Sequence, residues 1–170
     1  QISNTYSDRD NTLTMRDFFD LLAIHELGHA FHNQGGLNMQ RKWMGELFAN
    51  ILLHTYIAEK EPELLPALTF FPQMVVFSTN KSELKFTTLN ELETNYELLG
   101  QKYSQNYGWY QCRWHKAAGD IYNDGGTKAF KKLWQTLKKQ KEPLDDGAFA
   151  KLLSKKVHKS VASVQLKWNE

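Results

Sequence analysis

Apolar residues recur every three or four positions between Thr14 and the pair Gly35-Gly36. This spacing lines one face of an α-helix, so the pattern predicts a helix of about five turns. Thr14 and Asp17 have the spacing of an N-terminal capping box, and the two glycines are typical of a helix end. The apolar positions that define this helix are Phe18, Leu21, Leu22, Ile24, Leu27, Ala30 and Phe31.

The same periodicity predicts further helices along the rest of the chain. A second helix is expected over about residues 40–59, with apolar positions at Trp43, Leu47, Ile51, Leu52 and Tyr56. Gly125-Gly126 and Pro143 are expected to separate the later helices. These later helices are predicted over about residues 89–104, 107–123, 127–140 and 145–166.

Two segments do not follow helical spacing. Residues 1–12 are polar, which predicts a loop or one short strand. Residues 70–77 read FFPQMVVF and are β-prone, but Pro72 interrupts them, so we expect a loop or a short strand there. The chain is therefore predicted to be mainly α-helical, with little or no β-sheet, and to form a single domain over residues 1–170.

The composition supports one folded domain and argues against two classes of partner. The chain has 170 residues, of which 41% are hydrophobic, which is enough for a substantial core. Its 21 basic and 19 acidic residues give a net charge of +2, which provides no signal for nucleic acid. No apolar run approaches the roughly 20 residues of a transmembrane helix, so we expect no membrane span.

Cysteine usage excludes two further features. Cys112 is the only cysteine, so neither an internal disulfide nor a metal site built from cysteines is expected. The absence of cysteine pairs agrees with either a reducing or an oxidising compartment. A bacterial secreted or periplasmic location is a working guess, and the oligomeric state is not indicated.

The stretch IHELGHAFH, residues 24–32, contains the pattern HExxH within the first predicted helix. His25 and His29 project from the same face one turn apart, the arrangement with which two imidazoles bind one zinc ion. Glu26 lies beside them, where its carboxylate can reach a water molecule at the metal. This pattern on a helix is typical of zinc hydrolases that use the glutamate as general base. The sequence therefore predicts one Zn²⁺ ion bound by His25 and His29, with Glu26 as general base.

A catalytic zinc ion takes a third ligand from the protein and keeps a fourth position open. His32 lies on nearly the same face, but two helical turns, about 10.5 Å along the axis, separate it from His25. One ion cannot bridge that span, so we expect His32 at the surface or behind the metal ligands. Glu46 on the second helix is the better candidate, because it lies in the apolar string WMGELFA, where a carboxylate needs a partner.

Asn50 and His54 follow Glu46 at intervals of four residues and share its face of the second helix. Asn50 is placed to accept the N–H group of a zinc-bound histidine and so to fix the tautomer of that histidine. A lone histidine on an apolar helix is typically packed in the core, and we expect this of His54.

The strings HELGH and WMGELFA together resemble the gluzincin zinc metallopeptidases. The resemblance is greatest to the membrane alanyl aminopeptidase family, in which HExxH is followed by WLNEGFA. The residues that match this second motif are Trp43, Glu46, Phe48 and Ala49, and those that depart from it are Gly45 and Leu47. Sixteen residues separate His29 from Glu46, against eighteen in the family. The resemblance, which spans roughly residues 20–137, implies a zincin-like helical catalytic domain with Glu46 as third zinc ligand.

The same family carries a tyrosine on a later helix that stabilises the tetrahedral intermediate of peptide hydrolysis. In the family this tyrosine begins a pattern of the form Y…G…F…L. In this chain Tyr110, Gly125 and Phe130 fall at the family's spacings, and Leu133 follows. The resemblance therefore implies Tyr110 as the oxyanion donor. Tyr107, one turn earlier, is the second candidate, and His115 is a third, in the role that a histidine has in thermolysin.

In gluzincins a β-sheet precedes the HExxH helix and binds the peptide backbone by strand addition. Only 24 residues precede His25 here, and the aminopeptidase motif GxMEN, which captures the free amine of the substrate, is not among them. We therefore expect either the helical part of a larger protein, whose upstream β-rich domain would be a partner, or a reduced version. The resemblance does not imply aminopeptidase specificity.

The predicted function is zinc-dependent hydrolysis of peptide bonds in a peptide or protein substrate. The alternative is a non-catalytic zincin-like module that binds zinc and a peptide or protein partner. The intact Glu26 favours hydrolysis, because a binding module needs no general base.

Overall fold

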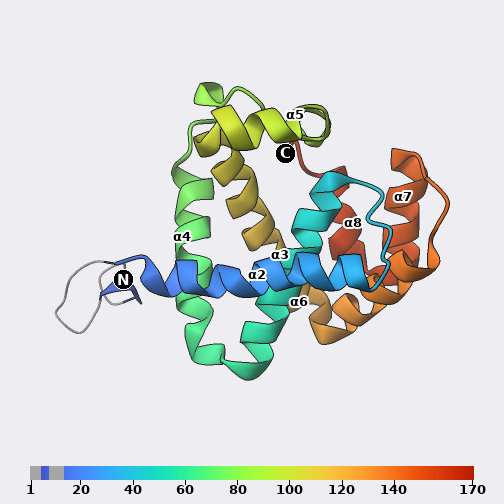
Figure 1. Ribbon diagram of the computed structural model, residues 1–170, viewed down its shortest axis with the longest axis horizontal. Coiled ribbons are helices and arrows are strands. Elements are labelled where there is room, and N and C mark those ends of the chain that lie inside the picture. Colours follow the sequence, from blue (N-terminus) through green and yellow to red (C-terminus); the bar gives the residue numbers. More distant parts are fainter. Residues whose placement is uncertain (1–4, 8–13) are drawn as a thin grey trace.

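The computed structural model describes residues 5–7 and 14–170, and these residues are mainly α-helical with no β-strand among them. The predicted mainly α fold is therefore confirmed. Helices are labelled as in Figure 1: α2 (Arg16–Gln34), α3 (Lys42–Lys60), α4 (Leu65–Ser78), α5 (Leu89–Lys102), α6 (Ser104–Lys139), α7 (Asp146–Leu152) and α8 (Lys159–Leu166). The 3₁₀ turns η1 (Pro62–Leu64) and η2 (Lys81–Glu83) and the π-helical turn η3 (Leu153–Val157) connect them. None of these helices combines the length and the apolarity that crossing a bilayer requires.

Helix α3 is the most buried of the described helices, and α2 and α6 pack against it. Figure 1 shows α2 running across α3 on one side of the molecule. Met44, Leu47 and Phe48 of α3 are fully buried, and they join α6 and the C-terminal helices in the largest hydrophobic core. Because α2 and α6 both contact α3, side chains of these three helices converge on one region.

The end of α2 directs the chain back toward the same helix. Gly36 has a φ of +62°, a backbone conformation that glycine adopts without a steric penalty. The N–H group of Gly36 donates to Asn33 O and that of Leu37 donates to His32 O, the two hydrogen bonds of a Schellman motif. The expected glycine stop is therefore present, and α3 begins at Lys42 and packs across α2.

The predicted capping box at the start of α2 is wrong. Met15 is the N-cap residue and makes no side-chain cap, while the hydroxyl of Thr14 accepts a hydrogen bond from Arg16 N. A complete capping box instead begins α5, where Thr88 and Glu91 each accept from the backbone of the other. The predicted loop or strand over residues 1–12 lies outside the described residues except at residues 5–7.

The predicted loop or short strand over residues 70–77 is wrong, because these residues belong to α4. Helix α4 packs against α6 and α2, and it buries Leu68 and Pro72. Packing of this apolar segment against two helices outweighs the β-preference of its side chains. Pro72 lacks the N–H group that would bond to Leu68 O, and the helix tolerates this loss.

The later helices agree with the prediction at one expected boundary and differ at another. Residues 104–139 carry the single label α6, but Gly126 has a non-helical backbone with a φ of +54° and kinks α6 where the glycine pair was expected to separate two helices. The segment predicted as one helix over 145–166 is divided into α7, η3 and α8. His158 has an extended backbone between η3 and α8, and its ring caps α8 by accepting from Ser160 N. Helices α3 and α5 agree with the predictions for residues 40–59 and 89–104.

Candidate metal centre

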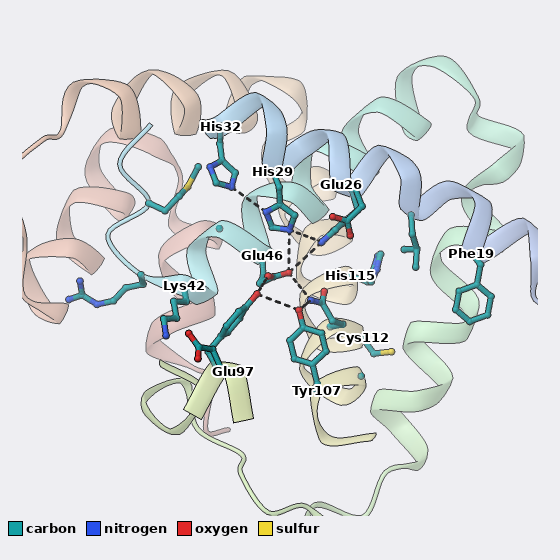
Figure 2. A pocket seen from close by; sticks show the side chains of 18 of the residues that line it. Phe19, Glu26, His29, His32, Lys42, Glu46, Glu97, Tyr107, Cys112 and His115 are labelled. Atoms are coloured by element: carbon teal, nitrogen blue, oxygen red, sulfur yellow. Dashed lines mark hydrogen bonds and ion pairs between the residues drawn. The ribbon is translucent and has the colours of Figure 1, made fainter. Parts of the chain in front are cut away.

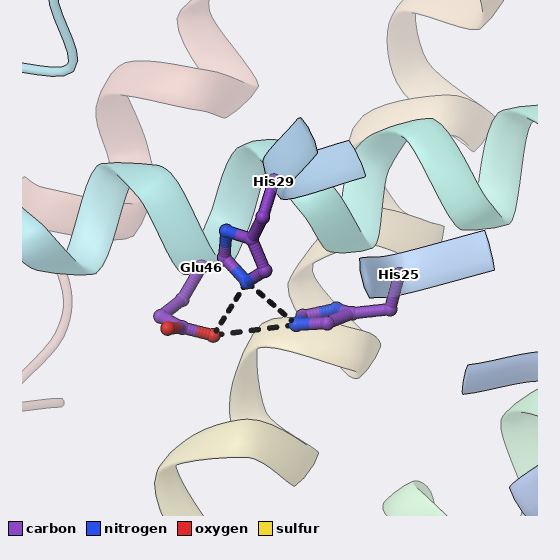
Figure 3. Close-up of side chains that lie close together, drawn as sticks. All are labelled: His25, His29 and Glu46. Carbon is purple, nitrogen blue, oxygen red and sulfur yellow. Dashed lines mark hydrogen bonds and ion pairs between the residues drawn. The ribbon is translucent and has the colours of Figure 1, made fainter. Parts of the chain in front are cut away.

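His25 and His29 lie one turn apart on α2, and both direct a ring nitrogen toward Glu46 of α3 (Figure 3). The Nε2 atoms of His25 and His29 are 3.1 Å apart. Glu46 Oε2 lies 3.4 Å from His25 Nε2 and 3.6 Å from His29 Nε2. In the described part of the chain this is the one group of three histidine, cysteine or acidic residues that could hold a metal ion.

These three separations match the edges of a tetrahedral zinc site. With zinc–nitrogen and zinc–oxygen bonds of about 2.1 Å, ligand atoms at tetrahedral angles lie about 3.4 Å apart. Two nitrogens and one oxygen also form the donor set of gluzincin-type catalytic zinc, which leaves a fourth position for water or substrate. The residues present therefore fit a zinc ion held by two histidines and one carboxylate.

Glu46 is nearly fully buried, and both of its carboxylate oxygens accept hydrogen bonds. The hydroxyl of Tyr96 on α5 donates to Oε1, and the side-chain amide of Gln111 on α6 donates to Oε2 over 2.6 Å. Burial alone would raise the pKa of the Glu46 carboxyl, but hydrogen bonds from the two histidines, Tyr96 and Gln111 hold it well below its usual value. The carboxyl is therefore ionised and fixed in orientation, as a metal ligand must be.

The ring of His29 is held on its other side as well. Its Nδ1 atom lies 3.2 Å from Nε2 of His32, which is buried with 8% of its surface exposed. Of the two positions expected for His32, the structure gives the buried one, next to the group of three donor residues. The hydrogen bond with Glu46 raises the pKa of His29, whereas burial lowers the pKa of His32.

A cavity of about 830 Å³ opens beside the three donor atoms (Figure 2). Glu26 is exposed on α2 and lines this cavity together with His25 and His29. The apolar part of its lining includes Phe18, Phe19, Leu22 and Phe71. A volume of this size is common for sites that bind small ligands or parts of larger ones.

The structure places Tyr110 away from this cavity, so the role implied for it by the resemblance is not supported by its position. Its side chain is fully buried, its ring stacks on Trp114 and Trp168, and its hydroxyl donates to Thr88 O over 2.7 Å. Tyr110 lies three residues after Tyr107 on α6. The turn of the helix over these residues gives the two side chains different directions, and that of Tyr110 points into the core.

Tyr107 and His115, the other two candidates, both line the cavity. The hydroxyl of Tyr107 accepts a hydrogen bond from Gln111 over 2.8 Å and lies 3.4 Å from the hydroxyl of Tyr96. Burial raises the pKa of Tyr107, so the hydroxyl keeps its proton. Burial, with smaller contributions from His25 and His54, lowers the pKa of His115 to about 3, so its ring is neutral.

Asn50 does not form the predicted hydrogen bond with a histidine. Its amide nitrogen donates to Glu46 O over 3.0 Å and to Gln111 Oε1 over 3.4 Å. Asn50 Oδ1 and His25 Nδ1 are both buried without a hydrogen-bond partner among the described residues. Asn50 therefore supports Gln111 and the backbone of Glu46 instead of a histidine tautomer.

His54 is packed in the core, as expected, with its ring against Gly119 and at 5.6 Å from that of Tyr122. Sequence reasoning missed Tyr96 and Gln111, which hold the carboxylate of Glu46. Gln111 lies four residues after Tyr107 on the same helical face. The candidate Tyr107 was therefore the one feature of the sequence from which Gln111 could have been predicted near the site.

Comparisons with protein-family models, curated proteins and solved structures give no match for this chain. The case for a metal centre therefore stands on the positions and chemistry of the three donor residues.

Proposed function

We propose that this chain is a gluzincin-type zinc metallopeptidase, with His25, His29 and Glu46 as the zinc ligands. The observation that carries the proposal is the convergence of three donor atoms at 3.1 to 3.6 Å on one side of a cavity. Without a cation, two imidazole nitrogens and a carboxylate oxygen at these distances have only shared protons to offset their mutual repulsion. Zinc is the metal proposed because a set of two histidines and one carboxylate is a common zinc set.

A bound zinc ion would supply Lewis-acid chemistry, lowering the pKa of its water toward about 7 and polarising a carbonyl group. Glu26 follows His25 directly, and its exposed carboxylate lines the same cavity. In the proposed reaction Glu26 takes a proton from the attacking water and later returns it to the leaving amine. The intact carboxylate at this position favours hydrolysis over a module that only binds a partner.

Tyr107 is the proposed donor to the oxyanion that forms on the substrate. Its hydroxyl oxygen already accepts from Gln111, and its neighbour Tyr96 directs its own proton to Glu46. The proton of Tyr107 therefore faces only the oxygen of Tyr96, at the long distance of 3.4 Å. It can turn to a substrate oxygen, where it would stabilise developing negative charge. The neutral ring of His115 is the second candidate for this role.

The substrate class, a peptide or protein, is proposed from the resemblance of the two motifs to gluzincins.

A test is the replacement Glu26→Gln in zinc-loaded protein, with a library of internally quenched peptides as substrate. We expect zinc to bind as before and cleavage to fall by at least 10²-fold, since general-base catalysis contributes about 10²–10⁴. Asp20→Asn removes an exposed carboxylate from the same helix, paired with Arg16, and serves as the control. Cleavage by Glu26→Gln at the wild-type rate would exclude the general-base role, and absence of cleavage by the wild type would favour a binding module.

A further inference from the structure

His29 presents its two ring nitrogens to two different partners. Its Nε2 atom faces His25 and Glu46, whereas its Nδ1 atom lies 3.2 Å from Nε2 of His32. A neutral histidine that offers Nε2 to a metal carries its proton on Nδ1. His29 is therefore the donor and His32 the acceptor, so the proton of His32 lies on its own Nδ1.

The ring of His32 is held where it can accept this hydrogen bond. It is 8% exposed, and it packs edge-on against Phe48 with the ring centroids 5.8 Å apart. Phe48 lies on α3, two residues after Glu46. The helix that supplies the third donor thus also fixes the acceptor for His29.

The other two donor residues have different supports. Glu46 is held by Tyr96 and Gln111, while His25 Nδ1 has no hydrogen-bond partner among the described residues. In the same part of the chain, His32 is the one hydrogen-bond partner of His29 Nδ1. His32 does not belong to the group of three donor residues itself.

We infer that His32 is a positioning residue, which fixes the ring and the tautomer of His29 for metal binding. Histidine ligands of metals commonly donate their second N–H group to a carboxylate, a backbone carbonyl or water, and here a neutral imidazole takes that place. Because this acceptor carries no charge, it makes His29 less basic than a carboxylate would, and a bound metal keeps more of its positive charge. The inference rests on the metal centre of the proposed function but not on its hydrolytic step.

The test compares two replacements of His32. His32→Phe keeps an aromatic ring against Phe48 but removes the acceptor, whereas His32→Gln restores an acceptor at the place of Nε2. His54→Phe is the matched control, because it removes another buried histidine that lies outside the donor group. Zinc affinity is measured by competition with a chromogenic chelator, the site geometry by the visible absorption of bound cobalt(II), and folding by thermal unfolding.

We expect His32→Phe to weaken zinc binding by about 10–100-fold and to change the cobalt spectrum, since loss of such partners has this effect in other metal sites. The zinc affinity of His32→Gln should lie within about threefold of that of the wild type. The zinc affinity of His54→Phe should equal that of the wild type. Equal affinities and spectra for His32→Phe and the wild type would overturn the inference, as would equal losses in both His32 variants. Metal binding without peptide cleavage would contradict the proposed function alone, and absence of metal binding by the wild type would overturn both.

Discussion

Gly28 of α2 lies directly against Ala49 of α3, so closely that a Cβ atom added to the glycine would be 2.8 Å from Ala49 Cα. This Cα atom belongs to the backbone, which cannot move aside as the end of a flexible side chain can. Gly28 lies between the two histidines of the donor group, and Ala49 follows Glu46 by three residues. The close contact of these two residues therefore sets the distance between the helices that carry the three proposed metal ligands.

Gly28→Ala is expected to separate α2 from α3 and to damage the metal centre. Overpacking at a rigid contact costs about 1–3 kcal/mol of folding free energy, and zinc affinity should fall as Glu46 moves away. Urea unfolding and chelator competition measure the two effects. Gly100→Ala is the control, because nothing lies within 4 Å of the added Cβ atom, and in a helix this change is expected to stabilise by up to about 1 kcal/mol. Unchanged stability and zinc affinity in Gly28→Ala would contradict the account.

The two tyrosines of α6 are expected to respond differently to loss of their hydroxyls. Tyr107→Phe should lower kcat by about 10²–10³-fold, as loss of one oxyanion donor does elsewhere, with little change in zinc affinity. Tyr110→Phe loses only the hydrogen bond to Thr88 O, so it should cost about 1 kcal/mol of stability and leave kcat unchanged. Steady-state peptide cleavage and thermal unfolding distinguish the two. A large fall in kcat for Tyr110→Phe alone would restore the assignment implied by the family resemblance.

His115 is expected to make the stability of the metal-free protein depend on pH. The pKa of its buried ring is about 3 in the fold, against about 6.5 in the unfolded chain. Between these values only the unfolded chain binds the proton, so stability falls as the pH falls below about 6.5. Removing the ring removes this contribution.

The corresponding measurement is urea unfolding of the wild type and of His115→Phe at pH 7 and pH 5, with a chelator present. From pH 7 to pH 5, the free energy of unfolding of the wild type should fall by about 2 kcal/mol more than that of the variant. His25 and His54, which contribute to lowering the pKa of His115, are retained in the variant. Equal losses in both proteins would contradict a neutral buried His115.

The parts of the candidate site that follow from one helix were predictable from the sequence. The four-residue spacing of His25 and His29 fixes their common face through helix geometry alone. The role of Glu46 could be predicted for two reasons. A glycine turn follows α2, and the apolar neighbours of Glu46 leave its carboxylate in need of a partner. The closeness of these three residues is thus a consequence of local rules and one short connection.

The parts that depend on packing between distant helices were not predictable in the same way. Tyr96 and Gln111 come from α5 and α6, and only the tertiary arrangement brings them to the carboxylate of Glu46. Tyr107 and Tyr110 lie three residues apart in an aromatic stretch, so the sequence pattern did not decide which of them faces the cavity. In α4, packing against two helices outweighed the β-preference that residues 70–77 have by themselves.

The central claim is that one zinc ion is bound by His25, His29 and Glu46. The most direct measurement is a crystal structure of the zinc-loaded protein with anomalous diffraction data collected at the zinc edge. We expect one strong anomalous peak between α2 and α3, about 2.0–2.2 Å from His25 Nε2, His29 Nε2 and Glu46 Oε2. A peak coordinated by His32 or His54 instead, or no peak at these three residues, would contradict it.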